Sequence, residues 1–401
     1  MKFSKWSQLV LVSLIGLSVA TLLTSCAIVT IDYVFVANSA GTGGAGQIQT
    51  FDADSETGAL RSGAPTVPSG GTTPVSVVAS ADYANLYVVN QASNNVVHFA
   101  IAGNGVLTQK DVLTTSATPV AVAVNTAGTY LYVVSGPNPS LLTEYSLSSG
   151  TIGSATAEIA LALPAFAADT IVPTAVNVTA NNGAVYVSAY DQSAYNPGGT
   201  TTSTANPGWV FGYSVGSGGA LTTASGSPYK AGVKPSALIS DPTNRFLYVT
   251  DFASNQLIGY TIQSGSVLNF LINGPFKTGN EPNSLTNDPR GKYMYVSNGL
   301  DSTVSAYVID LSTGTPSGAV NVTGSQLNST DTTPVSVIVD PALGRFVYTA
   351  NQIGDTVSGF RLDPNTGALT TTQATPYPVG AAPSALAAVP HGNHSLQTVS
   401  P

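Results

Sequence analysis

A short apolar segment led by an aromatic residue recurs seven times along the 401-residue chain, 45 to 62 residues apart. Each copy ends in a small or polar residue, and six of the seven begin with tyrosine. The copies are Phe35-Val-Ala-Asn38, Tyr87-Val-Val-Asn90, Tyr132-Val-Val-Ser135, Tyr186-Val-Ser-Ala189, Tyr248-Val-Thr-Asp251, Tyr295-Val-Ser-Asn298 and Tyr348-Thr-Ala-Asn351. A unit of this length that recurs so often indicates a repeat architecture, in which each unit buries its apolar faces against its neighbours.

Three further anchors divide each unit into four short strands. A proline followed by small residues precedes six of the aromatic segments, and a seventh copy follows the last one. A second aromatic residue marks the next strand, and in most units a Gly turn leads into a Thr/Ser-rich strand. The prolines are Pro74, Pro119, Pro173, Pro235, Pro282, Pro334 and Pro383, and the second aromatic residues are Phe51, Phe99, Tyr145, Tyr213, Tyr260, Tyr307 and Phe360. Four strands per unit predict an all-β fold, a seven-bladed β-propeller rather than a solenoid.

The position of the last proline strand has a topological consequence. The first unit begins at its aromatic strand and lacks a proline strand, whereas Pro383 to Val389 is a proline strand with no unit after it. We therefore expect the C-terminal strand to pair into blade 1 and to close the ring without an open edge. The predicted propeller covers residues 31–390 and is followed by a tail at 391–401.

The first 25 residues have the organisation of a signal peptide. Lys2 and Lys5 precede an apolar run of about fifteen residues, which is too short for a typical transmembrane helix. The next residues, Leu23-Thr-Ser-Cys26, resemble the bacterial lipobox, in which the cysteine thiol is acylated. We expect cleavage before Cys26 and a lipidated linker at 26–30. The exported protein is then anchored in the bacterial cell envelope, on the periplasmic side or at the cell surface.

Composition excludes several classes of protein. Only 8% of the residues are charged and 43% are hydrophobic, which is unlike a disordered chain. The net charge of −8 and the absence of a basic run argue against a nucleic-acid partner. Cys26 is the only cysteine, so no disulfide can form within the chain. The sequence contains no cofactor motif, and we expect a monomer.

The repeated segment carries a family resemblance. Tyr248-Val-Thr-Asp251 and its relatives resemble the bacterial surface propellers named after a Tyr-Val-Thr-Asn repeat. The full unit, as in Pro334 to Leu369, also resembles the seven-bladed lactonase-like family that includes propeller-type 6-phosphogluconolactonases. The resemblance covers about residues 31 to 390. It implies a ligand site on the face whose loops lead into the innermost strands, with His and Arg at the channel mouth in the lactonases. The sequence predicts neither residue type there.

The repeat spacing favours blades 4 and 5 as the place of a ligand site. Blade 4 is the longest unit, with insertions at Leu161–Thr170 and Tyr190–Trp209 that should emerge on one face. Long loops on a rigid scaffold often carry function, and aromatic rings there could stack against a sugar or an apolar ligand. The alternative is that the acidic residues cap turns and the insertion binds nothing. The candidate ligand-binding residues are Tyr190, Asp191, Tyr195, Trp209, Lys234, Glu281 and Asp331.

The sequence predicts neither a metal site nor a catalytic set. Asp191, Glu281 and Asp331 could ligate a hard cation, but no His pair stands at ligand spacing, so no metal is expected. His98 is expected on the surface of an outer strand. We expect a module that binds a carbohydrate, a small molecule or a protein through its loop face. Hydrolysis of 6-phosphogluconolactone or simple lactones at an enzymatic rate is not expected. The alternatives are a lactonase-family hydrolase acting on a sugar lactone and a purely structural surface protein.

Overall fold

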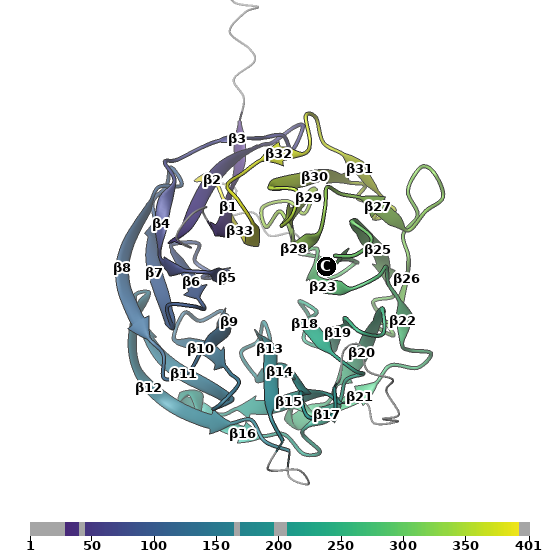
Figure 1. Ribbon diagram of the computed structural model, residues 1–401. Helices are drawn as coiled ribbons and strands as arrows, with labels where there is room; N and C mark the ends of the chain where they lie inside the picture. The colour runs from purple at the N-terminus through teal and green to yellow at the C-terminus, as the bar shows by residue number, and fades with distance from the viewer. Residues whose placement is uncertain (1–28, 40–44, 164–168, 196–206, 393–401) are drawn as a thin grey trace, which may run out of the picture.

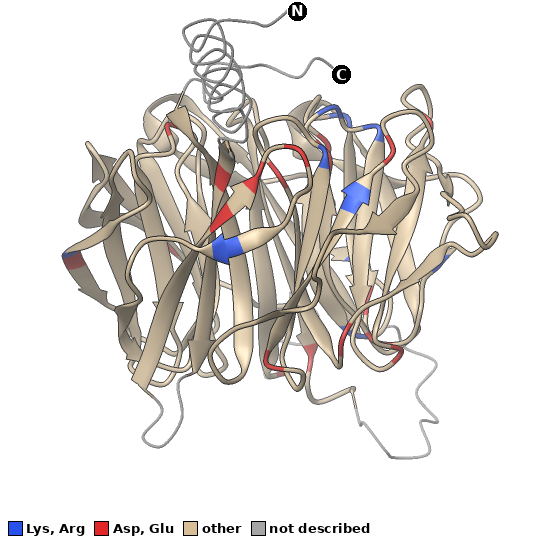
Figure 2. Cartoon of the chain, turned by 90° about the horizontal axis from the view of Figure 1, so that it is seen from above, with Lys and Arg blue, Asp and Glu red and all other residues tan. Residues whose placement is uncertain are grey.

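Seven twisted sheets stand around a central axis in the computed structural model (Figure 1). The structure describes residues 29–39, 45–163, 169–195 and 207–392. Each sheet is a blade whose strands run antiparallel from the axis to the rim. The seven-bladed propeller expected from the repeats is thereby confirmed. In the side view of Figure 2, charged residues lie at both ends of the ring and also on strands of its wall.

In the first four blades the strands follow one another from the axis outwards in chain order, except that β33 is the innermost strand of blade 1. Blade 1 contains β33 (Pro383–Pro390), β1 (Thr30–Ser39), β2 (Ala45–Asp54), β3 (Leu60–Ser62) and β4 (Val67–Thr72). Blade 2 contains β5 (Pro74–Ala79), β6 (Asn85–Asn90), β7 (Asn95–Ile101) and β8 (Leu107–Thr114). Blade 3 contains β9 (Pro119–Val124), β10 (Tyr130–Ser135), β11 (Leu141–Ser148) and β12 (Thr151–Ala160). Blade 4 contains β13 (Ile171–Val178), β14 (Ala184–Asp191), β15 (Gly208–Val215), the 3₁₀ turn η1 (Ser217–Gly219), β16 (Leu221–Thr223) and β17 (Tyr229–Lys230).

The remaining three blades have the same order. Blade 5 contains β18 (Pro235–Ser240), β19 (Phe246–Asp251), β20 (Gln256–Ile262), the 3₁₀ turn η2 (Ser264–Ser266), β21 (Leu268–Phe270) and β22 (Phe276–Lys277). Blade 6 contains β23 (Pro282–Asn287), β24 (Tyr293–Asn298), β25 (Thr303–Ile309), β26 (Pro316–Gly318) and β27 (Leu327–Ser329). Blade 7 contains β28 (Pro334–Val339), β29 (Phe346–Asn351), β30 (Thr356–Leu362), β31 (Leu369–Thr371) and β32 (Tyr377–Pro378). In blade 1 and blades 4 to 7 the fourth strand is interrupted, so two short pieces pair with the third strand.

The C-terminal strand closes the ring, as the sequence predicts. β33 pairs antiparallel with β1, with Phe35 opposite Ala387, and thereby supplies the innermost strand of blade 1. The edge of β1 that an open ring would expose is therefore hydrogen-bonded within a sheet.

The second strand of each blade is apolar on both faces because it packs against two neighbouring blades. In blade 4, Val185 and Val187 join a cluster with residues of blade 3. Tyr186, whose side chain points the other way, joins a cluster with Leu247 and Tyr260 of blade 5. We call the packed interface between two neighbouring blades a seam. Because successive side chains of a strand point to opposite faces, alternate residues of the second strand enter the two seams on either side of its blade. This packing on both faces explains why an aromatic residue followed by apolar residues recurs in every blade.

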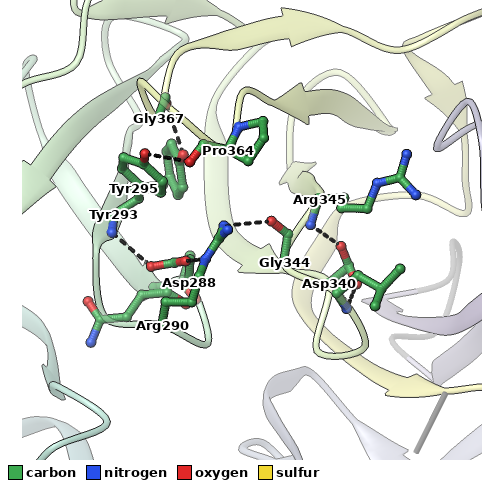
Figure 3. A network of polar contacts seen from close by, with 12 residues as sticks. Asp288, Arg290, Tyr293, Tyr295, Asp340, Gly344, Arg345, Pro364 and Gly367 are labelled. Atoms are coloured by element: carbon green, nitrogen blue, oxygen red, sulfur yellow. Dashed lines mark hydrogen bonds and ion pairs between the residues drawn. The ribbon is translucent and has the colours of Figure 1, made fainter. Parts of the chain in front are cut away.

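Tyrosine hydroxyls also join each blade to the next. The Tyr295 hydroxyl of blade 6 donates to the Gly367 carbonyl of blade 7 at 2.9 Å, and Tyr293 donates to the Pro364 carbonyl (Figure 3). Blades 1 and 3 use a tyrosine two residues before the repeated aromatic. The other donors and acceptors are Tyr33 to Gly103, Tyr87 to Gly150, Tyr130 to Gly218, Tyr186 to Ser266, Tyr248 to Gly314 and Tyr348 to Gly58. All seven seams therefore have a tyrosine clamp.

The ring has two different faces. On one, which we call the turn face, the first strand of a blade turns into the second. In blades 5, 6 and 7 an aspartate begins this turn and accepts backbone N–H groups. Asp340, for example, accepts those of Leu343 and Phe346 at 2.8 and 2.9 Å. On the other, the loop face, chain segments enter the first strand and leave the second. Among the described residues, no helix is long and apolar enough to cross a membrane.

Candidate functional site

Seven equivalent positions surround the channel mouth on the loop face, one before each innermost-strand proline. Five carry uncharged residues. Blade 5 carries Lys234 and blade 6 carries Glu281 at this position. The two positions are fixed in the same way, because the Phe252 N–H donates to the Lys234 carbonyl and the Gly299 N–H donates to the Glu281 carbonyl, both at 2.9 Å. The uncharged equivalents are Thr73, Thr118, Val172, Thr333 and Ala382. Opposite charges thus stand on adjacent blades at the mouth.

A buried aspartate fixes the segment that carries Lys234. Asp251, which is fully buried, accepts the N–H groups of Val233 and Lys234 at 2.9 Å each and the side-chain amide of Gln256 at 3.0 Å. Gly232 is required here, because its φ is +73° and a Cβ would lie 2.0 Å from an Asp251 oxygen. Gly232 and Gln256 also line a cavity of about 270 Å³ on the outer side of this segment. The backbone under Lys234 is therefore rigid.

Three aromatic rings surround the Lys234 ammonium group. Its Nζ lies 4.3 Å from the centre of the Phe252 ring, 5.6 Å from that of Tyr195 and 5.8 Å from that of Tyr190. Tyr190 and Tyr195 contact each other edge to face, with ring centres 5.4 Å apart. Each such cation–π contact contributes about 0.5–1 kcal/mol when exposed and more when water is excluded. The rings thus hold the ammonium at the mouth.

The site is partly shielded from water, and this shifts its titrating groups. Burial lowers the pKa of Lys234, while the negative charge of Glu281 acts in the opposite direction. Burial also raises the pKa of Tyr195, with further contributions from the charges of Asp251 and Glu281. Glu281 therefore interacts electrostatically with Lys234 and Tyr195, as expected for groups in one site.

Asp191 and Asp169 form a carboxyl pair at the blade 4 side of this site. Burial raises the pKa of Asp169, and a hydrogen bond to Asp191 and the charge of Asp191 raise it further. The Asp191 carbonyl accepts the Tyr195 N–H at 3.0 Å, and its carboxylate accepts the Ser193 N–H at 2.8 Å. Asp191 therefore also positions the turn that carries Tyr195.

Two of the predicted candidates lie elsewhere. Trp209 lies in β15 under the Lys230 ammonium, 3.6 Å from its ring centre, and packs against the apolar cluster between blades 3 and 4. Asp331 accepts hydrogen bonds from Thr332 and Thr356 at the junction of blades 6 and 7. The Thr356 hydroxyl is the main reason that the pKa of Asp331 is lowered. The structure thus brings together Tyr190, Asp191, Tyr195, Lys234 and Glu281 but neither Trp209 nor Asp331.

Sequence reasoning missed one member of the site, Phe252, and placed another, Asp251, on the loop face only as a turn-capping residue. Phe252 follows the repeated segment of blade 5, where the other blades have small or polar residues except for Tyr190 in blade 4. Aligning the seven units at this position would have identified both rings. The parts of the predicted insertions at 164–168 and 196–206 lie outside the described residues.

The interpretation of His98 as a surface residue was wrong. His98 is 2% exposed in β7, where its Nδ1 lies 2.8 Å from an Asp111 carboxylate oxygen and its Nε2 lies 2.8 Å from the Asn85 side-chain oxygen. The ring stacks on Tyr87 within blade 2. The neighbouring polar groups compensate its burial, which the strand pattern alone did not indicate.

No described His or Arg approaches Lys234. His391 packs against Tyr33 near the turn face, and the described arginines lie in turn-face turns or outer strands. In the same ranges no group of three His, Cys, Asp or Glu could hold a metal ion. Any acid–base chemistry at the mouth must therefore use carboxylates, the lysine or the tyrosines.

Comparison with known proteins identifies a family and similar solved structures. The family model described as "Lactonase, 7-bladed beta-propeller" matches residues 24–123 and 101–394. Comparison with curated protein sequences gives no match.

Similar solved structures share the fold at low sequence identity. The periplasmic gluconolactonase of Pseudomonas aeruginosa has a TM-score of 0.72 at 20% identity, with 90% of this chain and 100% of that chain covered. Two Bacteroides proteins described as 6-phosphogluconolactonases each have a TM-score of 0.69. The one from B. fragilis is 19% identical, and the alignment covers 90% of this chain and 98% of that one. The one from B. uniformis is 18% identical, with 90% and 100% covered.

Proposed function

The chain belongs to the seven-bladed β-propeller lactonase family. From this premise we propose the alternative to the binding module expected from the sequence: the protein hydrolyses an unphosphorylated sugar lactone at its channel mouth. One observation carries the proposal. Lys234 and Glu281 are the two charged residues among the seven pre-proline positions, they lie on adjacent blades, and they have opposite charge. An acid–base pair beside aromatic walls provides the groups that ester hydrolysis requires.

The two charged groups have complementary roles in this proposal. The Glu281 carboxylate takes a proton from a water molecule, whose oxygen attacks the lactone carbonyl carbon. The Lys234 ammonium stabilises the negative charge that develops on the carbonyl oxygen. The ring C–O bond then breaks, and the leaving alkoxide takes the proton held by Glu281, which gives the hydroxy acid and restores the carboxylate. Tyr190, Tyr195 and Phe252 stack against the sugar ring and exclude water from one side.

The local charge favours a substrate without a phosphate group. Lys234 is the one cation that we assign to the described part of the site, whereas Glu281, Asp251 and the Asp169–Asp191 pair surround it with carboxyl groups. A phosphate dianion needs several donors, usually Arg or Lys, and would be repelled by these carboxylates. The Pseudomonas aeruginosa neighbour, described as a periplasmic gluconolactonase, supports this choice.

The test uses glucono-1,5-lactone and 6-phosphogluconolactone as substrates, with acid release followed at constant pH. Wild type should hydrolyse the first far faster than the second. Glu281→Gln should lower kcat by about 10²- to 10⁴-fold, the usual contribution of a positioned base. Lys234→Met should lower kcat/KM, and Thr333→Val at the equivalent position of blade 7 is the matched control. If wild type does not exceed the spontaneous rate, the proposal is wrong.

A second candidate, a binding module without turnover, is supported by the aromatic rings around Lys234. A cation with stacking faces is sufficient to bind a sugar acid, which is also the product of the proposed reaction. Calorimetry with gluconate distinguishes the two functions. Binding that is lost in Lys234→Met, together with no hydrolysis by wild type, would favour the binding module.

We further propose that the protein is exported and anchored through Cys26, a residue outside the described ranges. β1 begins at Thr30 on the turn face, and four extended residues span at most about 14 Å. An anchor at Cys26 would therefore keep the turn face close to the membrane and direct the loop face away from it. Cys26→Ser should move the protein from the detergent phase to the aqueous phase in a partitioning assay, and unchanged partitioning would contradict the anchor.

A further inference from the structure

A buried carboxyl group lies where the ring closes. Asp32 is in β1, opposite Ala53 of β2 and Pro390 of β33, and its side chain is fully buried. Neither of its carboxyl oxygens has a hydrogen-bond partner of normal geometry among the described residues. A buried carboxylate without donors is strongly destabilising, so the group requires a positive partner or a proton.

Asp32 shares a strand face with Val34 and Val36, which pack against blade 7, and the blade 7 side chain that acts on it is another acid, Asp340. It begins the turn between β28 and β29, is fully buried, and accepts the backbone N–H groups of Leu343 and Phe346.

The charge of Asp32 acts on Tyr83, and the charges of Asp32, Asp340 and Asp54 act on Tyr348. Neither tyrosine supplies a positive charge. The cationic side chains next to this pair along the chain are Arg345, whose backbone N–H donates to Asp340, and His391, which follows the Pro390 partner of Asp32.

The seam between blades 6 and 7 contains a positive charge, paired with the turn aspartate, that the described residues of the seam between blades 7 and 1 lack. Between blades 6 and 7, the Arg290 Nε lies 2.6 Å from Asp288, and its Nη2 donates to the Gly344 carbonyl of blade 7 at 3.2 Å (Figure 3). The guanidinium therefore neutralises the turn aspartate and links two blades. In blade 7 the position after the turn proline is Ala342, which is fully buried and has no charge to offer Asp32.

We propose that a proton closes the ring: Asp32 is a neutral carboxylic acid in the folded protein and donates its proton to the Asp340 carboxylate. The O–H of Asp32 then performs at the seam of blades 7 and 1 the linking role that Arg290 performs one seam earlier. Loss of that proton places two carboxylates face to face without a counter-charge. The seam formed by β1 and β33 against blade 7 is then the weakest in the ring.

The electrostatics agree with this geometry. Burial raises the pKa of Asp32 well above its usual range, the charge of Asp340 and a hydrogen bond to it raise the pKa further, and the Ala342 backbone acts weakly in the opposite direction. Because the folded pKa lies above the unfolded one, the folded state holds this proton more tightly. Its contribution to stability is present in full below the unfolded pKa and is lost as the pH rises through the folded pKa.

The test is Asp32→Asn, which keeps the shape of the neutral acid and replaces its O–H donor by an amide N–H. The melting temperature of wild type should fall as the pH rises from mildly acidic to alkaline, and the fall should be smaller in Asp32→Asn. At the alkaline end the variant should be the more stable protein. Asp301→Asn, a loop-face change in blade 6, is the control and should retain the wild-type pH dependence.

Two further measurements keep the proposal falsifiable. Infrared spectroscopy at neutral pH should show the carbonyl stretch of a protonated carboxyl that is absent in Asp32→Asn. Hydrogen exchange should accelerate in β1 and β33 before other inner strands as the pH rises. The proposal fails if wild type and Asp32→Asn have the same pH dependence. It also fails if chelators lower the melting temperature of wild type only, because a metal ion and not a proton would then occupy the pair.

Discussion

The turn face repeats a tyrosine clamp at every junction between blades, whereas the side chains around the channel mouth on the loop face vary from blade to blade. On the turn face, Tyr248 and Tyr295 donate to equivalent glycine carbonyls of the following blade. On the loop face, equivalent positions before the inner strands carry threonine, valine, alanine, lysine or glutamate. The difference indicates that the stability of the fold restricts which residues can occupy the clamp positions of the turn face. It restricts the mouth positions of the loop face much less. A clamp residue must fit a neighbouring blade, whereas a mouth residue needs only a backbone that holds it.

The largest effect is expected from opening the ring. Removing residues 381–401 deletes β33 and leaves β1 without its inner neighbour. The loss should be several kcal/mol, comparable with the total stability of about 5–15 kcal/mol of many domains. Thermal unfolding should then occur at much lower temperature or lose its cooperativity.

Removal of residues 393–401 alone is the matched control for this truncation and should change little. An unchanged melting temperature after removal of 381–401 would show that the turn-face clamps suffice without closure.

A methyl group on a turn-face glycine should have the next largest effect. A Cβ at Gly314 would lie 2.4 Å from the Phe246 ring of blade 5, and the φ of Gly314 is +74°. Gly314→Ala should cost about 3 kcal/mol, since it combines left-handed strain with a steric clash. Gly265→Ala, with a φ of +72° and nothing within 4 Å of the added Cβ, tests the strain alone and should cost about 1–2 kcal/mol. Both variants are compared by denaturant titration. Equal losses in the free energy of unfolding would show that the close packing of Gly314 against Phe246 does not contribute to stability.

Removing one clamp hydroxyl should have a smaller effect. Tyr248→Phe leaves the buried Gly314 carbonyl without its donor at 2.7 Å and should cost about 1–2 kcal/mol. Tyr130→Phe removes an equivalent bond at an exposed position, where water can replace the hydroxyl, and should cost less. Chemical denaturation of both variants gives the comparison. A larger loss from Tyr130→Phe would show that burial does not govern the clamps.

Changes at the mouth should have the smallest effect on stability. Glu281→Gln should alter the free energy of unfolding by about 0.5 kcal/mol or less, because it lies on the loop face. Lys234→Met also loses its cation–π contacts and should cost about 1 kcal/mol. The same variants should lower lactone hydrolysis strongly. Melting curves measured beside the activity assays check this separation. A large loss of stability in either variant would show that the loop face also contributes to the fold.

Much of the fold could be predicted from the sequence, because a short strand pattern that is ambiguous by itself becomes reliable when it occurs seven times. Single strands such as Tyr186–Ala189 are short, but seven copies fix both strand order and the place where the ring closes. The interruption of the fourth strand could not be predicted, because the outer Thr/Ser-rich segments lack an apolar pattern. Of the candidate site, Lys234, Glu281 and the two tyrosines came together, because inner-strand prolines and second strands place them on one face.

What the sequence by itself determined is the architecture, since alternation along each strand decides which seam a side chain enters. Only the tertiary structure showed which polar and charged side chains are buried and which groups they contact. Asp32 is buried against Asp340, His98 against Asp111, and Trp209 lies beside Lys230 rather than Lys234. These partners are far apart in the chain or on different strands, and no local pattern records them. The physical reason is that apolar burial follows strand periodicity, whereas compensation of a buried charge depends on which particular groups meet across a seam.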